Sequence, residues 1–258
     1  MTEVPAPTPV DLAHDLTGSG PPVVLLHGIT EDRRCWLPVV EELARTATVL
    51  AVDLRGHGAS PVVAPFDLAT MAADVHAVVA QHGLEAPLVV GHSLGGMVAT
   101  AYASALPTRG VINVDQPLDL VAFQDQLGAV EAQLRDADAF PLVISGLFAS
   151  MRGAVPDAQW ARVEAIRTPN QEVVLGVWSP VLEQSAAALR AMVDDVLATV
   201  DTPYLAVHGS DPGPGYVDWL YERIPGAEVE VWADHGHYPH LVDPSRFAAT
   251  VRAFDPVG

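Results

Sequence analysis

Short apolar runs that alternate with amphipathic stretches are the feature of this sequence that most constrains its fold. The runs are almost continuously apolar, which is typical of strands buried on both faces of a parallel sheet. Between two of them, from Asp67 to Gly83, apolar residues recur at helical spacing, with Asp67 as the expected N-cap. The sequence therefore predicts an α/β fold built on a mostly parallel sheet, with one antiparallel strand near residues 11–16. The expected parallel strands are Pro22–His27, Thr48–Asp53, Leu88–Gly91, Val111–Asp115, Tyr204–His208 and Val229–Trp232.

This alternation stops between Pro117 and Thr202, where no convincing strand run occurs and several prolines interrupt the chain. Three segments there have a helical pattern, at 119–137, 156–167 and 182–199. We therefore expect a helical insertion, residues 117–202, within a core formed by residues 1–116 and 203–258. At 258 residues, one α/β domain with an inserted subdomain is the natural organisation.

Charge and composition exclude several classes of function. The chain has 32 Asp and Glu against 13 basic residues, and all 13 are Arg. Nucleic acids and anionic membranes require a basic face, so we expect a small-molecule substrate as the partner, with no nucleic acid and no membrane. The absence of Lys excludes a Schiff-base or PLP mechanism. The single Cys35 excludes an internal disulfide.

The N-terminus indicates a cytoplasmic location. It has neither the positive region nor the apolar region of a secretory signal. No apolar run approaches the ~20 residues that a membrane helix needs. The sequence leaves the oligomeric state open.

The strongest chemical signal is Gly91-His92-Ser93-Leu94-Gly95. It follows the strand-like run 87–90 and precedes a helical pattern, which is the context of a nucleophile elbow. In such an elbow a serine projects from a sharp turn, and the flanking glycines avoid side chains that the turn has no room for. Ser93 is therefore the expected nucleophile, and a structural turn without chemistry is the alternative.

Attack by Ser93 would create an oxyanion, which needs two preorganised N–H donors. One is expected from Leu94, the residue after the nucleophile. The other is expected from Ile29, in the His27–Thr30 segment that follows an earlier strand.

A third segment, Asp234–His240, follows the last expected strand and contains three histidines. His237 is favoured as the base, because Gly236 before it gives the loop conformational freedom and Pro239 after it ends the loop. The spacing of the histidines does not suit a metal site, and neither a metal nor a cofactor is expected.

Together these segments resemble the α/β-hydrolase superfamily over nearly the whole chain. The resemblance rests on His27-Gly28 with Trp36 at the usual distance, Asp53–Ser60, Gly91–Gly96 and Gly236–His240. It implies an α/β-hydrolase fold, in which a twisted, parallel-rich sheet has helices on both faces and the helical insertion is a cap over the active site. It also implies the chain order nucleophile, acid, histidine.

The acid is where the sequence departs from the superfamily pattern. The superfamily usually has Gly-x-x-Asp after the penultimate strand, whereas Gly209-Ser210-Asp211 is one residue shorter. Asp211 is the first choice, and Asp115 is the alternative because some relatives carry the acid after the strand that precedes the cap. Either carboxylate would hold the imidazole of His237 in the required tautomer and stabilise the imidazolium.

These residues predict a serine hydrolase. Ser93 would attack a carbonyl carbon while His237 takes its proton, and His237 would then activate water against the acyl-enzyme. We expect a carboxylic ester or lactone of a small to medium, apolar substrate. A carbon–carbon bond hydrolase, a thioesterase or a cofactor-free haloperoxidase-like enzyme would use the same residues. A non-catalytic ligand receptor on the same fold is the alternative from another class.

Overall fold

A computed structural model describes residues 8–255 of the chain. Residues 1–7, which carry half of the N-terminal segment used to exclude a secretory signal, lie outside the described residues. Across the described range, no helix is both long enough and apolar enough to cross a membrane.

A seven-stranded sheet forms the centre of the molecule, in the order β1-β3-β2-β4-β5-β6-β7. Strand β1 is antiparallel to β3, and all the other neighbouring pairs are parallel. The expected mostly parallel sheet with one antiparallel N-terminal strand is therefore confirmed. The strands are β1 (His14–Gly18), β2 (Pro22–Leu26), β3 (Thr48–Val52), β4 (Leu88–His92), β5 (Gly110–Val114), β6 (Tyr204–His208) and β7 (Glu228–Val231).

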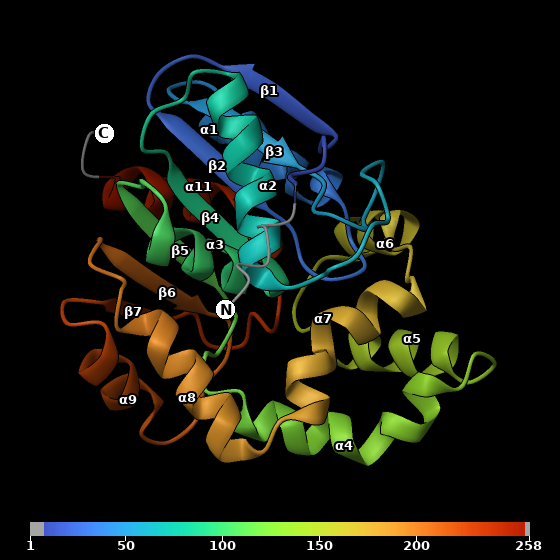
Figure 1. Cartoon of the computed structure of the whole chain (residues 1–258). Helices are drawn as coiled ribbons and strands as arrows, with labels where there is room; N and C mark the ends of the chain where they lie inside the picture. Colours follow the sequence, from blue (N-terminus) through green and yellow to red (C-terminus); the bar gives the residue numbers. More distant parts are fainter. Residues whose placement is uncertain (1–7, 256–258) are drawn as a thin grey trace.

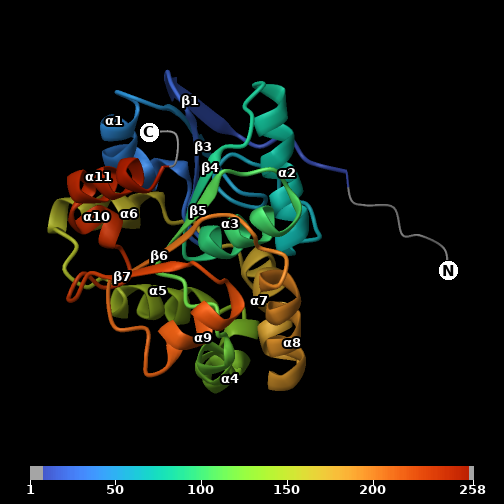
Figure 2. The ribbon, with the colours of Figure 1, turned by 90° about the vertical axis from the view of Figure 1, so that its left-hand side faces the viewer.

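The central strands are buried on both faces, as their continuous apolar character predicted. Val24 and Leu26 of β2 belong to one hydrophobic core, whereas Val23 and Leu25 belong to the other. Helices α1 (Leu37–Leu43) and α11 (Pro244–Phe254) cover one face of the sheet, and α2 (Leu68–Gln81) and α3 (Leu94–Ala105) cover the other (Figure 2). A short 3-10 helix, Arg33–Trp36, precedes α1, while α9 (Tyr216–Arg223) and α10 (Pro239–Val242) lie between later elements.

The helix between Asp67 and Gly83 begins and ends where the sequence predicted it, and α11 begins in a comparable way. The side chain of Asp67 accepts a hydrogen bond from the N–H of Thr70 and caps α2, and Gly83, with φ of +61°, follows the end of that helix. Asp243 caps α11 in the same way, through the N–H of Arg246. These ends are local, so the residues at each end suffice to specify them.

Residues 117–202, all of them described, form five helices and no strand. They lie together at one end of the sheet (Figure 1). Three match expected segments, namely α4 (Val121–Arg135), α6 (Asp157–Ile166) and α8 (Ala186–Leu197). The other two, α5 (Phe140–Ser150) and α7 (Gln171–Glu183), had not been expected because each contains a proline.

Neither proline prevents its helix from forming. Pro141 lies in the first turn of α5, where the missing N–H would have no partner inside the helix. Pro180 lies within α7, which buries Val173, Val174 and Trp178. Tertiary burial along α7 therefore outweighs the local cost of its proline.

Candidate active site

The carboxyl ends of β2, β4, β5, β6 and β7 meet at one edge of the sheet, because these strands are parallel. The segments that follow them carry the residues selected from the sequence. A cavity of about 1270 Å³ opens at this edge. It is lined, among others, by Ile29, Ser93, Leu94, Asp115 and His237.

Ser93 occupies the turn between β4 and α3 with φ of 52° and ψ of −120°. A positive φ is strained for a residue with a side chain, and such strain is concentrated at functional sites. The turn is held by a 3.0 Å hydrogen bond from the N–H of Ser93 to the carbonyl oxygen of Val114. A side chain at Gly91 would collide with the backbone of Gly95, so the two glycines permit the turn.

Leu94 is the first residue of α3, and the first N–H groups of a helix have no partner within it. The N–H of Leu94 therefore remains free of the α3 ladder, next to Ser93. Ile29 lies in the loop after β2, lines the same cavity and is almost fully buried. The fold thus places both expected oxyanion donors around one cavity.

Asp115 is the carboxylate beside His237. The Nδ1 of His237 lies 2.7 Å from Oδ2 of Asp115, and the N–H of Gly209 donates to Oδ1 over the same distance. Burial would raise the pKa of Asp115, but the hydrogen bonds from His237 and Gly209 outweigh it and lower this pKa. Asp115 therefore stays ionised and accepts a hydrogen bond from the Nδ1–H of His237, which leaves Nε2 free to act as a base.

The structure thus places the alternative carboxylate, Asp115, beside His237, and it does not bring the first choice, Asp211, to this imidazole. Asp211 lines the cavity, but it is exposed and accepts a 2.9 Å hydrogen bond from the N–H of Gly213 in its own loop. The loop after β6 contacts the loop that carries His237 at Gly209, which precedes Asp211 in the chain. The carbonyl oxygen of Gly209 accepts hydrogen bonds from the N–H groups of His235 and Gly236, so backbone atoms make this contact.

The backbone of His237 is held from two sides. The Nε2 of His92 lies 2.8 Å from the carbonyl oxygen of His237 and donates to it. The N–H of His237 donates to the carbonyl oxygen of Met151, in the turn that follows α5, at 3.2 Å. The loop that carries His237 is therefore anchored both to β4, through His92, and to the helical insertion, through Met151.

A buried ionic cluster of Glu31, Arg167 and Tyr238 links three segments around the site, namely the loop after β2, the segment between α6 and α7, and the loop that carries His237. Arg167 leads from α6 toward α7, and its guanidinium lies 3.5 Å from Oε1 of Glu31 and 3.0 Å from the Tyr238 hydroxyl. The Tyr238 hydroxyl donates to Glu31 at 2.9 Å. Burial would raise the pKa of Glu31, but His92, Arg167 and Tyr238 together lower it, so Glu31 is a buried anion.

No sequence pattern predicted this cluster. Glu31 directly follows one selected segment and Tyr238 lies within another, but Arg167 had no local pattern to mark it. A buried charge needs a partner of opposite charge, but the burial of Glu31 is visible only in the structure.

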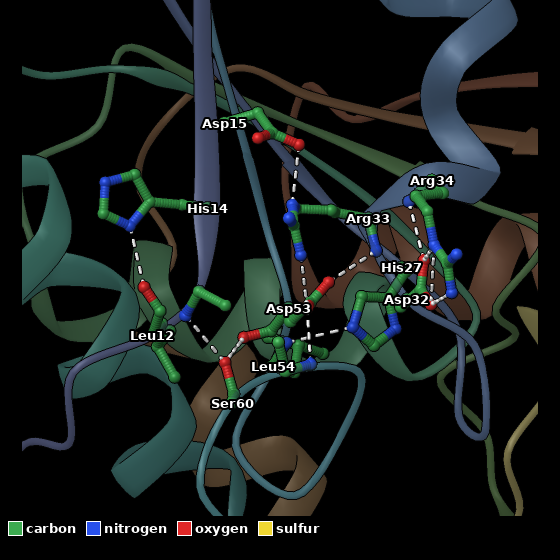
Figure 3. A network of polar contacts seen from close by, with 12 residues as sticks. Leu12, His14, Asp15, His27, Asp32, Arg33, Arg34, Asp53, Leu54 and Ser60 are labelled. Carbon is green, nitrogen blue, oxygen red and sulfur yellow. Dashed lines mark hydrogen bonds and ion pairs between the residues drawn. The ribbon is translucent and has the colours of Figure 1, made fainter.

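The Asp53–Ser60 segment has a structural role beside the site (Figure 3). The carboxylate of Asp53 accepts the N–H of Ala59 and the guanidinium of Arg33. The N–H of Leu54 donates to Nε2 of His27 over 2.9 Å. These bonds fix the end of β3 against the loop that carries Ile29.

Acid should destabilise the fold through its buried histidines. Burial lowers the pKa of His57 to about 3, and it also lowers the pKa values of His27, His92 and His240. An unfolded histidine binds a proton near pH 6.5, so below this pH the unfolded state gains protons that the folded state excludes. We expect the free energy of unfolding to be highest above pH 6.5 and to decrease as the pH falls from 6.5 to 5. The expected slope is about 1.4 kcal/mol per pH unit for each such histidine.

Urea unfolding at pH 7.5, 6.5, 5.5 and 5.0 measures this slope. The variant His57→Gln removes one of the groups and should reduce the slope by about one proton. Equal free energies of unfolding at pH 7.5 and 5.0 would contradict the expectation.

Comparisons with known proteins agree with this fold. A model of the alpha/beta hydrolase family matches residues 23–250. The chain belongs to the alpha/beta hydrolase family. The expected superfamily and fold are thereby confirmed.

Individual relatives of this hydrolase include esterases. A pimeloyl-acyl-carrier-protein methyl ester esterase of Neisseria meningitidis serogroup B is 30% identical over 256 residues, which cover 90% of this chain and 92% of the relative. An esterase structure from Exiguobacterium antarcticum superposes with a TM-score of 0.74 at 23% identity, and the match covers 94% of each chain. The structure of Est816, an N-acyl homoserine lactone degrading enzyme, superposes with a TM-score of 0.71 at 25% identity and covers 95% of this chain and 97% of that one.

Proposed function

We propose that this hydrolase cleaves a carboxylic ester or lactone through an acyl-enzyme, with Ser93, His237 and Asp115 as its catalytic triad. The observation that carries the proposal is the 2.7 Å contact of His237 with Asp115 in a cavity that Ser93 also lines. A buried carboxylate that orients a histidine next to a strained serine is the arrangement that serine hydrolases require.

In the proposed reaction, Nε2 of His237 removes the proton of the Ser93 hydroxyl as its oxygen attacks the carbonyl carbon. The N–H groups of Ile29 and Leu94 stabilise the resulting oxyanion. Collapse of this intermediate transfers the proton from His237 to the leaving alcohol and forms an ester on Ser93. Water, deprotonated by His237, then attacks this ester and releases the acid, and Ser93 regains its proton.

Two observations support an ester or lactone and a role for the inserted helices. Relatives and structural neighbours include esterases and an enzyme that degrades a lactone. Side chains from α4, α7 and α8, among them Phe123, Trp178 and Val193, line the cavity that contains Ser93. We infer that residues 117–202 act as a cap and present an apolar surface to the substrate.

Labelling with a fluorophosphonate probe tests the proposal. We expect a covalent adduct on Ser93 and turnover of p-nitrophenyl esters, and neither with Ser93→Ala, because the probe reacts with an activated serine. A panel with p-nitrophenyl acetate, an N-acyl homoserine lactone and pimeloyl-acyl-carrier-protein methyl ester separates the substrate classes. A folded protein with neither adduct nor turnover would refute the hydrolase proposal and favour a ligand receptor.

A further inference from the structure

The cavity at Ser93 is larger than a small ester needs. Small-molecule sites measure roughly 300–1,000 Å³, whereas this cavity measures about 1270 Å³. The additional space offers room for a part of the substrate that is remote from the scissile bond.

Part of the cavity lining follows α3 over its whole length, and we call this part a branch of the cavity. Met97, Ala101, Ser104 and Ala105 line it at helical spacing, so one face of α3 forms its floor. From Ser93 to Ala105 the helix rises about 18 Å at ~1.5 Å per residue. An extended chain advances about 1.25 Å per bond, so this floor matches a chain of roughly fourteen bonds.

The side chains along this branch are small or apolar. Ala72 and Ala73 of α2 border it on one side, and Val181 of α7 with Val193 and Leu197 of α8 border it on the other. Alanine at four positions of the floor and wall leaves the width that a chain requires. The composition therefore suits methylene groups rather than a polar moiety.

The charges around the cavity disfavour an anionic substrate. Among the described residues that line it, the acidic ones are Asp67, Asp115, Asp119 and Asp211, and there is no Arg. A carboxylate or phosphate on the substrate would meet like charges and no cation to neutralise it. The favoured ligand is therefore uncharged.

We propose, resting on the hydrolase function above, that the substrate is an uncharged ester with an unbranched apolar chain of about ten to fourteen carbons. The chain lies along the α3 face formed by Met97, Ala101, Ser104 and Ala105, with the ester carbonyl at Ser93. Chain length is set by how far this face extends before the cavity ends.

Two series of uncharged esters test this substrate class. In the first, p-nitrophenyl esters vary the acyl chain from two to sixteen carbons; in the second, alkyl acetates vary the alcohol. We expect kcat/KM to rise about two- to fourfold per added methylene up to ten to fourteen carbons in one series, because each methylene buries apolar area. The series that shows the optimum tells which part of the ester carries the chain. A dodecanoyl ester with a terminal carboxylate should be at least tenfold poorer than its methyl-terminated counterpart.

Two substitutions at different depths locate the chain. Ala101→Leu lies about 12 Å along α3 from Ser93 and Ser104→Phe about 16 Å, so Ala101→Leu should shift the optimum to about eight carbons and Ser104→Phe to about ten. Ala80→Phe, on the exposed surface of α2 outside the cavity lining, is the matched control and should leave the length profile unchanged.

Binding is a readout that does not require turnover. With Ser93→Ala, methyl dodecanoate should change the fluorescence of Trp178 and Trp219, which line the cavity, and methyl butyrate should not. A flat length profile in both series, unaltered by Ala101→Leu and Ser104→Phe, would overturn the substrate class and leave the hydrolase function intact. Absence of any Ser93 adduct and of any turnover would overturn the hydrolase function, and the substrate class with it.

Discussion

Replacing Asp115 with Asn is expected to lower kcat for ester hydrolysis by about 10⁴-fold, with little change in KM. In other serine hydrolases, the same change at the triad carboxylate has an effect of this size. An Asn at 115 presents an NH₂ group or a neutral carbonyl to Nδ1 of His237, where the carboxylate now lies at 2.7 Å. The imidazole then loses the partner that holds its tautomer and stabilises its charged form.

Asp211→Asn is the matched control, because Asp211 lines the same cavity and its carboxylate accepts a hydrogen bond only from its own loop among the bonds described for it. We expect its kcat to stay within about threefold of the wild type. Steady-state kinetics on one p-nitrophenyl ester, with circular dichroism to verify folding, compares the two. A large loss in Asp211→Asn together with a near-normal Asp115→Asn would mean that the carboxylate beside His237 is not the functional acid.

Replacing Arg167 with Met is expected to lower the free energy of unfolding by about 3–5 kcal/mol, which is the cost of leaving a buried charge without its partner. The side chains of Arg167 and Glu31 are 6% and 1% exposed. Without the guanidinium, Glu31 keeps the Tyr238 hydroxyl but no cation. Met retains much of the packing against the Phe148 ring, over which the guanidinium lies at 4.0 Å, so the loss reports mainly the charge.

Arg152→Met is the matched control in the same group of helices. Arg152 pairs with Asp157, whose side chain is 96% exposed, so its loss should cost less than about 1 kcal/mol. The double variant Arg167→Met/Glu31→Gln should recover most of the stability, because no unpaired charge remains buried. Urea unfolding measures all four proteins, and a change below 1 kcal/mol in Arg167→Met would show that the cluster does not stabilise the fold.

The parts of the candidate site that could be predicted from sequence are those marked by residues that are close together in the chain. Ser93 was identifiable because its turn requires glycines at fixed positions next to it. His237 was identifiable because Gly236 and Pro239 delimit its loop at the end of the last strand. The helices with internal prolines, α5 and α7, were not identifiable in this way, since their stability depends on burial against other helices.

The buried Glu31–Arg167–Tyr238 cluster and the extent of the cavity had no sequence pattern. Arg167 meets Glu31 only because the chain between α6 and α7 passes over the loop that follows β2. The cavity length depends on which small residues of α3 face α7 and α8 rather than solvent. Both properties arise from the packing of segments that are distant in the chain.

By itself, therefore, the sequence determined the sheet and the family, and it predicted Ser93 and His237 as nucleophile and base, because apolar periodicity and turn chemistry act between near neighbours. Only the tertiary structure decided which carboxylate lies beside His237. Asp115 and His237 are 122 residues apart, and Asp211 lies nearer to His237 in sequence. The paths of the loops after β5 and β6 bring Asp115 to the imidazole, whereas the carboxylate of Asp211 accepts a hydrogen bond from the backbone of its own loop. No local sequence pattern encodes these paths.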